Sequence, residues 1–527
     1  MTVTQDVRER GNAAQRDAGE DDAWSAGTPF GGLADRAMRV LWLWPTLLTA
    51  ILGCYQLGRP ELWRDELYGW SFAADPVPQL IASVRKTNAA QLAYDLMLHY
   101  WIAAFGASAD AMRVLSVLAM AGAAAFVTLA GRRLAGDRAG LLAGLIFALL
   151  PSVSRFAQEV RFYSLDMMLA ALSLLVLLRA LDQPTVRRWT AYGLSLAVLG
   201  YIDVVALAVV VGHAAGAVLR WWRERDACLL AGFAVSAVAG LGACLPIIVV
   251  GWGEAGRQVY WISRPGLDLT TFALFGRSLF FSTSVAAVVI LLAVLAWAVD
   301  RQAAAFATAL AILPVATAWL LSQGPHSYFF PRYLLFTVGA WAVLAGIGLS
   351  SLDARIAASA VLVVAILGAG DQQVIRETGA HNWSFYPVGP GGYYMDYAGA
   401  AAFVARQARP GDGIVYQAGE HGDKWLMVGY GLRYYLARDM PNGLAVPREL
   451  FVARTAAQAD TLYPAPCQNP AACLGAEPRI WVIGVGRQKS PYQAVNPAQA
   501  AVLRPRYRVS LVKHERSLTM FLLTRAP

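Results

Sequence analysis

The sequence is dominated by a series of apolar stretches, each close to the length that crosses a bilayer. A transmembrane helix needs about 20 apolar residues, and about eleven such stretches precede residue 370. Charged residues make up only 15% of the chain, whereas soluble domains carry about 25%. We therefore predict a mainly α-helical, polytopic membrane protein. The apolar stretches lie near 38–57, 110–131, 139–157, 164–181, 189–201, 203–222, 227–250, 280–299, 303–322, 333–350 and 355–370.

The net charge of +9 does not indicate nucleic-acid binding, because many basic residues gather in short connections between the apolar stretches. Such connections follow the positive-inside pattern of cytoplasmic loops. With an odd number of spans, this pattern predicts a cytoplasmic N-terminus and an extracytoplasmic C-terminus. The Ala-, Arg- and Gly-rich composition favours a bacterial plasma membrane. The basic connections contain Arg132, Arg133, Arg138, Arg179, Arg187, Arg188, Arg220, Arg223 and Arg225.

The chain divides into three predicted parts. Residues 1–37 are polar and lack the apolar core of a cleavable signal peptide, so we predict a disordered cytoplasmic tail. Residues 38–370 form the transmembrane part, with a long extracytoplasmic loop over 58–109. Two amphipathic stretches in this loop, near 66–74 and 91–105, fit the membrane interface.

After residue 370 the composition changes, and we predict a small extracytoplasmic α/β domain over 371–527. Short apolar runs indicate buried strands, and the end of the chain alternates like a hairpin. A local disulfide between Cys467 and Cys473 fits their polar, extracytoplasmic segment. No Cys/His cluster has the spacing of a metal site. The predicted strands are 414–417 and 480–485, the hairpin covers 507–525, and the helices are 396–408 and 424–437.

Asp65 and Glu66 lie shortly after the first apolar stretch. Ionisable groups at a bilayer are costly and are usually retained for function. Neighbouring residues on a helix point about 100° apart, so one carboxylate could face a reacting atom while its neighbour orients it. A single base suffices for inverting displacement at a sugar carbon, whereas double displacement needs two carboxyl groups on opposite sides. An ion pair with Arg64, or an acid at a helix start, explains the pair equally well.

A second polar group lies between the third and fourth apolar stretches, at their predicted extracytoplasmic end. Arg161 presents a rigid fork suited to phosphate oxygens, and Tyr163 adds a hydroxyl donor. The alternative is an Arg that snorkels beside an interfacial Tyr. Gln158 and Glu159 are too polar for lipid contact, which favours a functional cluster.

A third group opens the tenth stretch. Pro331 fits the first turn of a helix, and Arg332 follows it directly. The positive end of a helix and a guanidinium would then coincide, which suits a phosphate or pyrophosphate. By itself, His326 would be predicted to be a surface residue. It becomes a candidate for phosphate binding only because these neighbours are close to it in the sequence. His99 and Lys86 are weaker candidates, because basic groups near a membrane commonly bind anionic lipid heads.

These motifs together resemble the GT-C glycosyltransferases, and most closely the family 39-like branch of protein O-mannosyltransferases and the lipid A aminoarabinose transferase. The resemblance covers roughly residues 38–350. It rests on Trp63-Arg-Asp65-Glu66, Phe105-Gly-x-Ser with Met112-Arg113, Gln158-Glu-x-Arg161-x-Tyr163, and Phe329-x-Pro-Arg332-Tyr333.

The resemblance implies a polyprenyl-phosphate-linked sugar donor, used outside the cytoplasm with inversion. It assigns the base role to Asp65, the second acidic position to Glu66, and the lipid phosphate to Arg161 and Arg332. A prenyl phosphate leaves as an anion, so cationic groups can stabilise it and no metal or other cofactor is required. Relatives differ from this chain over Asn88–Tyr94, so the acceptor, whether glycan, lipid or protein, is not transferred from them.

Other functions are weighed against this one. A polyprenyl-pyrophosphate-dependent glycan ligase would need more cations for its phosphates. A polyprenyl-linked glycan transporter or flippase would spread ionisable residues through its spans and use internal repeats. If the membrane part served only to anchor an α/β binding module, the polar outer loops would remain unexplained. Because the ionisable residues collect at one predicted membrane face, the sequence favours the transferase.

Overall fold

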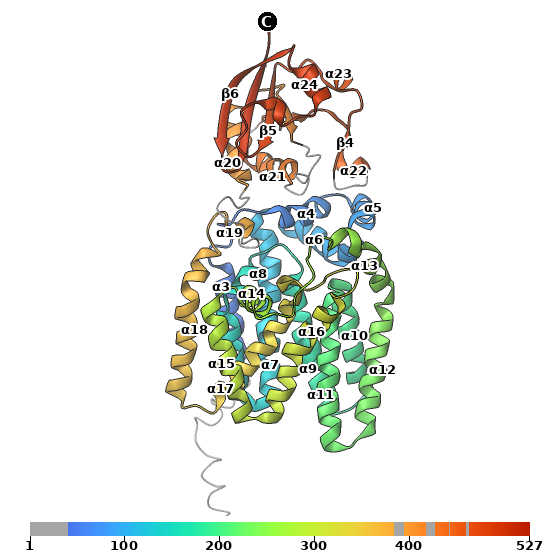
Figure 1. The fold of residues 1–527 in the computed structure, drawn as a ribbon, viewed down its shortest axis with the longest axis vertical. Coiled ribbons are helices and arrows are strands. Elements are labelled where there is room, and N and C mark those ends of the chain that lie inside the picture. The colour runs from blue at the N-terminus through green and yellow to red at the C-terminus, as the bar shows by residue number, and fades with distance from the viewer. Residues whose placement is uncertain (1–39, 384–394, 418–426, 442, 460–462) are drawn as a thin grey trace, which may run out of the picture.

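The computed structural model describes residues 40–383, 395–417, 427–441, 443–459 and 463–527. The predicted tail over 1–37 lies outside these residues. The described chain forms a helix bundle, a layer of short helices at one end of the bundle, and a sheet domain beyond that layer (Figure 1).

The bundle is built from the predicted apolar stretches. Six helices are long and apolar enough to cross a membrane, or up to eight helices and helix pairs if each bent pair is one span, counting described residues only. The total of about eleven crossings therefore stays a prediction. The helices are α3 (Leu43–Cys54), α7 (Ala109–Leu149), α8 (Pro151–Ala157), α9 (Tyr163–Asp182), α10 (Val186–Ile202), η2 (Val205–Ala208), α11 (Val209–Glu224), α12 (Ala227–Ala243), α13 (Leu245–Gln258), α14 (Leu269–Phe280), α15 (Thr283–Val299), α16 (Arg301–Leu321), η3 (Pro331–Thr337), α17 (Val338–Ser350) and α18 (Ala354–Val374).

Two of the predicted stretches are joined in α7, a 41-residue helix that is broken at Ala135 and Gly136. Gly136 has a φ of +87°, a conformation that glycine adopts without the strain of a side chain. Small residues also bring α7 and α17 close together. A side chain at Gly346 would collide with the backbone of α7 at Ala139, so this position needs a residue without a Cβ atom.

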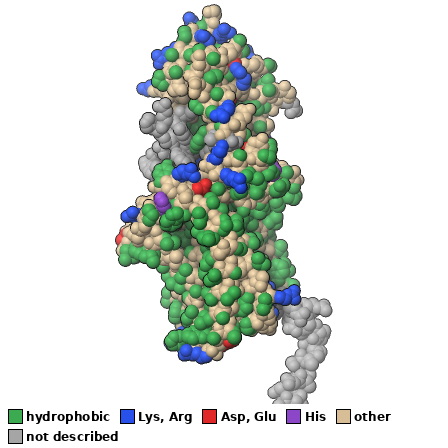
Figure 2. All heavy atoms as spheres, turned by 90° about the vertical axis from the view of Figure 1, so that its right-hand side faces the viewer, with side chains coloured by type: hydrophobic (Ala, Val, Ile, Leu, Met, Phe, Trp, Pro, Cys, Tyr) green, Lys and Arg blue, Asp and Glu red, His purple; other side chains and the backbone are tan. Residues whose placement is uncertain are grey.

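The outer surface of the bundle is apolar. Figure 2 shows hydrophobic side chains over the helices of one face, with Lys and Arg side chains at the lower end and again at the level of the short helices. Exposed Leu362, Val363 and Ile366 on α18 contribute to the apolar surface. An apolar surface of this extent, bounded by basic residues, is the one that lipid covers.

The predicted loop over 58–109 forms the layer of short helices between the bundle and the sheet domain (Figure 1). Both of its predicted amphipathic stretches are confirmed as helices. The elements are α4 (Arg64–Ala73), α5 (Val77–Thr87), η1 (Ala89–Gln91) and α6 (Leu92–Phe105).

The C-terminal region contains a five-stranded sheet in the order β2-β1-β5-β7-β6. Strand β1 pairs in parallel with β2 and β5, while β5, β7 and β6 pair antiparallel. The predicted strands and terminal hairpin are confirmed, and the second predicted helix begins at Val428 in the structure. The main elements are α19 (Ala380–Trp383), α20 (Tyr397–Gln407), β1 (Gly413–Tyr416), α21 (Val428–Asp439), β2 (Arg448–Glu449), β5 (Arg479–Val485), β6 (Tyr507–Glu515) and β7 (Leu518–Arg525), and the smaller ones are β3 (Val452–Arg454), α22 (Ala456–Ala459), β4 (Ala465–Pro466), α23 (Pro470–Cys473), η5 (Pro491–Gln493) and α24 (Pro497–Leu503).

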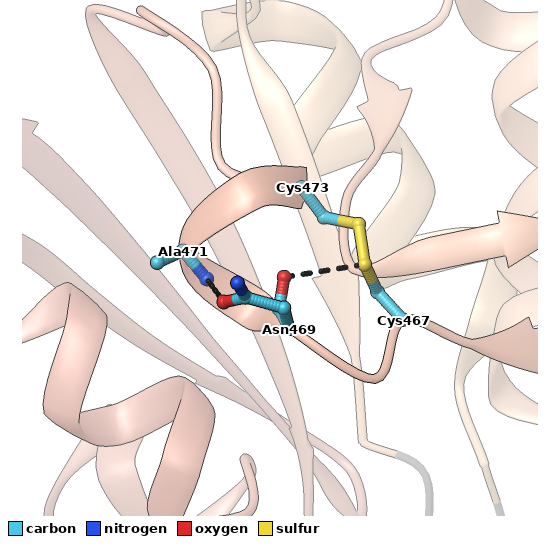
Figure 3. Close-up of a disulfide and its surroundings, with 4 residues drawn as sticks. All are labelled: Cys467, Asn469, Ala471 and Cys473. Carbon is cyan, nitrogen blue, oxygen red and sulfur yellow. Dashed lines mark hydrogen bonds between the residues drawn. A yellow bond between two sulfur atoms is a disulfide. The ribbon is translucent and has the colours of Figure 1, made fainter.

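The expected disulfide joins Cys467 to Cys473 across a six-residue separation, with 6.5 Å between their Cα atoms (Figure 3). Between them, the Oδ1 atom of Asn469 accepts a hydrogen bond from the N–H of Ala471 and caps α23. The disulfide therefore closes a small capped loop at the edge of the sheet domain.

The sheet domain is bonded to the start of α4, a contact that we call the junction. The hydroxyl of Tyr435 on α21 accepts a hydrogen bond of 2.8 Å from the N–H of Leu62. The N–H of Glu61 donates to the carbonyl of Thr378 at 2.9 Å. Two separate parts of the C-terminal region thus fix the residues that lead into α4.

Candidate active site

The first turn of α4 and the start of η3 meet at an ion pair between Asp65 and Arg332. Nη1 of Arg332 lies 2.7 Å from Oδ2 of Asp65, although the two residues are 267 positions apart in the chain. Pro331 opens η3, and the guanidinium of the next residue reaches α4 in the layer of loop helices. Nε of Arg64 lies 3.4 Å from the other carboxylate oxygen of Asp65. The structure therefore brings together the two residues on which the predicted mechanism depends.

The electrostatic surroundings keep Asp65 ionised. Burial alone would raise the pKa of its carboxyl group. The charges of Arg332, Arg64 and Arg161 outweigh burial and hold that pKa below its usual range. In the absence of a ligand, Asp65 is therefore a weak base surrounded by cations.

Aromatic rings surround the guanidinium of Arg332. Its central carbon lies 5.3 to 6.0 Å from the centroids of five rings. Contacts of this kind stabilise a cation that has lost most of its water. The arrangement holds a buried positive charge in a fixed position beside Asp65. The five rings belong to Trp63, Tyr163, Trp261, Phe330 and Tyr333.

Arg161 and Tyr163 belong to the same group. The guanidinium of Arg161 lies 6.0 Å from the ring of Tyr163, and its charge acts on Asp65. The hydroxyl of Tyr163 is buried and has no hydrogen-bond partner among the residues that the structure describes. A bound oxyanion would find two guanidinium groups and a hydroxyl donor here.

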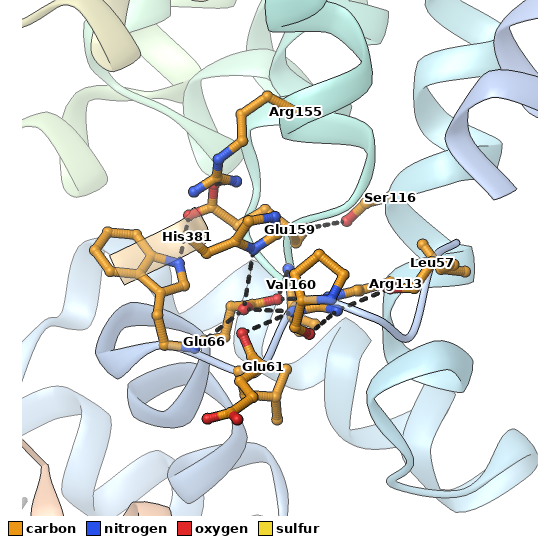
Figure 4. Close-up of polar contacts among 12 residues, drawn as sticks. Leu57, Glu61, Glu66, Arg113, Ser116, Arg155, Glu159, Val160 and His381 are labelled. Carbon is orange, nitrogen blue, oxygen red and sulfur yellow. Dashed lines mark hydrogen bonds and ion pairs between the residues drawn. The ribbon is translucent and has the colours of Figure 1, made fainter. Parts of the chain in front are cut away.

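Glu66 points into a different environment, the buried network of Figure 4. Both of its oxygens accept hydrogen bonds of 2.9 Å from Arg113, and Oε1 also accepts the N–H of Val160 at 3.0 Å. Burial would raise the pKa of Glu66, but Arg113 and His381 hold it well below the usual range. Glu66 therefore anchors the helix that carries Asp65, and its predicted role beside a catalytic base stays a prediction.

The network continues through Glu159. Nη1 of Arg155 lies 2.6 Å from one oxygen of Glu159, and the indole N–H of Trp63 donates to the other oxygen at 3.2 Å. Nδ1 of His381 on α19 lies 3.6 Å from Glu66. Burial, together with the charge of Arg155, lowers the pKa of His381 to about 3, so this histidine is neutral. Glu159 thus supports the site from behind Trp63.

Gln158 and His99 also support the fold near the site. The amide of Gln158 donates to the carbonyl oxygens of Gly53 and Tyr55, at 2.9 and 2.8 Å. Nδ1 of His99 lies 2.9 Å from the carbonyl oxygen of Ala73 at the end of α4. The first side chain holds the end of α3, and the second ties α6 to α4.

Lys86 and His326 are placed apart from the Asp65 ion pair. Lys86 is exposed in the last turn of α5. The ring of His326 lies 6.3 Å from that of Trp252 on α13. Among the described residues, no contact between His326 and Asp65 or Arg332 is found, so the predicted phosphate role of His326 stays a prediction.

Several residues of the site escape sequence reasoning. Arg113 occurs in a motif, but its bond to Glu66 has no local signal except an isolated charge near the start of an apolar helix. His381 and Tyr435 reach the site from more than 300 residues away and show no pattern. Asp95 is an isolated acid in an amphipathic stretch. Among the described residues, no three His, Cys, Asp or Glu side chains are grouped to hold a metal ion.

Comparison with solved structures shows that the fold is known. The chain is similar to ArnT from Cupriavidus metallidurans in the apo state, with a TM-score of 0.58, 14% identity, and coverage of 93% of this chain and 98% of that one. The same protein bound to undecaprenyl phosphate gives a TM-score of 0.58 and 14% identity, with coverage of 92% and 97%. The oligosaccharyltransferase AglB from Archaeoglobus fulgidus, in complex with an inhibitory peptide and a dolichol-phosphate, gives a TM-score of 0.42 and 12% identity, with coverage of 81% and 64%.

Comparison at the sequence level gives one further match. Residues 92–246 match the sequence model of the dolichyl-phosphate-mannose-protein mannosyltransferase family. No curated protein matches the chain. The matched segment begins at α6 and includes Arg161 and Tyr163. A part of the chain thus matches the mannosyltransferase family and the whole chain has an ArnT-like fold, and both findings agree with the resemblance to the GT-C glycosyltransferases that its motifs indicate.

Proposed function

We propose that the protein is an inverting glycosyltransferase that moves a sugar from a polyprenyl-phosphate donor to an acceptor hydroxyl on the extracytoplasmic face of the membrane. The observation that carries this proposal is the ion pair of Asp65 with Arg332, beside the charge of Arg161. A base and two phosphate-binding cations are the groups that such a reaction needs. The undecaprenyl phosphate in the ArnT structure of the same fold supports a lipid phosphate as the leaving group.

The reaction needs one base and no acid. The acceptor oxygen attacks the anomeric carbon while its proton moves to Asp65. The bond between that carbon and the phosphate oxygen breaks, and the polyprenyl phosphate leaves as an anion. Arg332 and Arg161 neutralise the charge that develops on it. With one carboxylate at the reacting carbon, attack opposite the leaving group inverts the configuration.

The ion pair also makes the strength of the base depend on the donor. A phosphate that binds Arg332 competes with Asp65 for the same guanidinium. When the guanidinium pairs with the phosphate, its effect on the carboxylate weakens and the pKa of Asp65 rises. The base thus becomes stronger only when a donor is in place, which limits proton transfer without a substrate.

The division of the chain follows the same proposal. Residues 38–370 form the catalytic membrane domain, and residues 371–527 form an extracytoplasmic α/β domain that covers the loop over 58–109. The junction supports this arrangement, because Tyr435 bonds directly to the residue before Trp63.

The function is tested with the full chain in lipid nanodiscs. Polyprenyl-phosphate sugars with a labelled sugar are offered together with candidate lipid, glycan and peptide acceptors. Release of polyprenyl phosphate with transfer of the label supports the proposal. Turnover of polyprenyl-pyrophosphate donors alone would favour the glycan ligase instead.

Replacing Arg332 with glutamine is expected to weaken donor binding by about 10- to 100-fold, the scale of one hydrogen bond to a charged group. The change also removes the guanidinium whose charge lowers the pKa of Asp65 more than that of any other cation. The pKa of Asp65 then rises, so the base is protonated at a higher pH and the acid limb of kcat/KM moves upward. Donor titration and a pH profile measure the two effects.

The exposed Arg264, in the connection between α13 and α14, gives a matched control. Arg264→Gln should change neither donor affinity nor the pH profile. If Arg332→Gln folds and binds the donor as tightly as the wild type, Arg332 is not a phosphate ligand.

A further inference from the structure

Asp95 on α6 is a buried carboxyl group with no hydrogen-bond partner in the described part of the chain. Its exposed fraction is 1%, and neither of its oxygens accepts a hydrogen bond from any residue that the structure describes. Burial of a polar group without a hydrogen bond is costly. A group of this kind in a loop that carries the base needs an explanation other than packing.

The neighbours of Asp95 connect it to the Asp65 ion pair. The charge of Arg161 acts on Asp95 as well as on Asp65, so the two carboxyl groups share the field of one guanidinium. Tyr68 interacts with Asp95 and stands three positions after Asp65, on the same side of α4. Both Asp65 and Tyr68 are partly exposed. This side of α4 therefore leads from the base toward Asp95.

Tyr94 adds a second unpartnered group. Its side chain is 1% exposed, and its hydroxyl has no hydrogen-bond partner within the described part of the chain. The titratable groups that act on Asp95 and Tyr94 are Arg161, Glu66 and Glu159, with Tyr68 facing Asp95. The two side chains thus offer a hydrogen-bond acceptor and a hydroxyl beside the guanidinium of Arg161.

The charges of Asp95 and Arg161 determine which kind of ligand group can bind beside them. Asp95 would repel a phosphate oxygen, and Arg161 would repel an ammonium group. A neutral hydroxyl can donate to the carboxylate and is compatible with the guanidinium. Burial raises the pKa of Asp95 to about 7 against the lowering effect of Arg161, so the carboxylate form is available near neutral pH.

We propose that Asp95 and Tyr94 bind the hydroxyl groups of a sugar next to the phosphate held by Arg161. This inference rests on the proposed function and adds a sugar-binding site on α6 to the phosphate site on η3. The carboxylate of Asp95 accepts a hydrogen bond from a sugar hydroxyl, and Tyr94 hydrogen-bonds to a second one. The same chemistry suits a hydroxyl of the donor sugar or of a sugar acceptor.

The test compares two lipids on the full chain in nanodiscs. One is undecaprenyl phosphate without a sugar, and the other is the same lipid with the sugar that the wild type turns over. Asp95→Leu should weaken binding of the sugar-bearing lipid by about 10- to 100-fold and leave binding of the sugar-free lipid unchanged. Arg332→Gln should weaken both lipids, which separates the phosphate site from the sugar site.

The KM for the acceptor, measured with the same variants, distinguishes a hydroxyl of the donor sugar from a hydroxyl of the acceptor. If donor binding is unchanged and the KM for the acceptor rises by a similar factor, the hydroxyl belongs to the acceptor. Asp95→Asn and Tyr94→Phe keep the shape of each side chain and serve where Asp95→Leu fails to fold. The exposed Asp110 at the start of α7 gives the control Asp110→Asn, which should leave every value unchanged.

Two failures have different meanings. A wild-type protein that turns over no polyprenyl-linked sugar would contradict the proposed function itself. Folded Asp95 and Tyr94 variants with wild-type affinity for both lipids and wild-type acceptor KM would overturn the sugar site and leave the proposed function intact.

Discussion

Replacement of Asp65 with asparagine is expected to lower sugar transfer by about 10²- to 10⁴-fold, the usual contribution of a positioned acid–base group. The side chain keeps its shape, and its amide oxygen can still accept a hydrogen bond from Arg332. What it loses is the ability to take the proton of the acceptor hydroxyl. The loss should therefore appear in kcat, with little change in binding of the sugar-bearing lipid.

Single-turnover transfer of a labelled sugar at saturating donor measures this effect. Asp110→Asn, an exposed acid at the start of the neighbouring helix α7, is the matched control and should retain wild-type turnover. A folded Asp65→Asn protein with wild-type kcat would remove Asp65 from the mechanism, whatever its distance from Arg332.

Removal of the carboxylate of Glu66 is expected to destabilise the protein by about 3–5 kcal/mol, because Arg113 would remain as a buried, uncompensated charge. Both side chains are fully buried. Arg113 also donates to the carbonyls of Leu57 and Pro60, so it holds the chain that enters α4. Thermal unfolding of Glu66→Ala in detergent, followed by the loss of the monodisperse species, measures the change.

A double variant sharpens this prediction. Glu66→Leu combined with Arg113→Met removes both charges, so its cost should be smaller than the sum of the two single changes. The partly exposed pair of Arg220 and Glu224 gives a matched control, because Glu224→Ala should cost less than about 1 kcal/mol. Additive losses at Glu66 and Arg113 would mean that the two charges do not depend on each other.

The helices and strands could be predicted largely from the sequence, because each depends on local patterns. Apolar stretches such as 303–322 and 355–370 have the length and composition of spans, and both are helices in the structure. The alternation over 507–525 likewise gave the terminal hairpin. The break at Ala135 and Gly136 lies in the predicted connection between the stretches 110–131 and 139–157, whereas the bend between α14 and α15 was not predicted, since it depends on how neighbouring helices pack.

The candidate site could be predicted only in part, for the same reason. Asp65, Arg161 and Arg332 stand out in the sequence, because ionisable residues at a membrane surface are costly and are usually retained for function. The sequence could not separate the environments of Asp65 and Glu66, which depend on the fold. One carboxylate pairs with Arg332 at a partly exposed position, and the other is enclosed with Arg113. Asp95 gives no signal in the sequence, because a single acid in an amphipathic helix usually faces water.

The junction has a consequence for how this protein can change. Tyr435 and Thr378 hold the two residues that precede Trp63, and His381 touches Glu66. Substitutions far out in the C-terminal domain can therefore displace Asp65 without contacting the proposed substrates. A chimaera that joined this bundle to the C-terminal domain of a distant homologue would lose these bonds. The two domains must therefore be exchanged together when the protein is engineered.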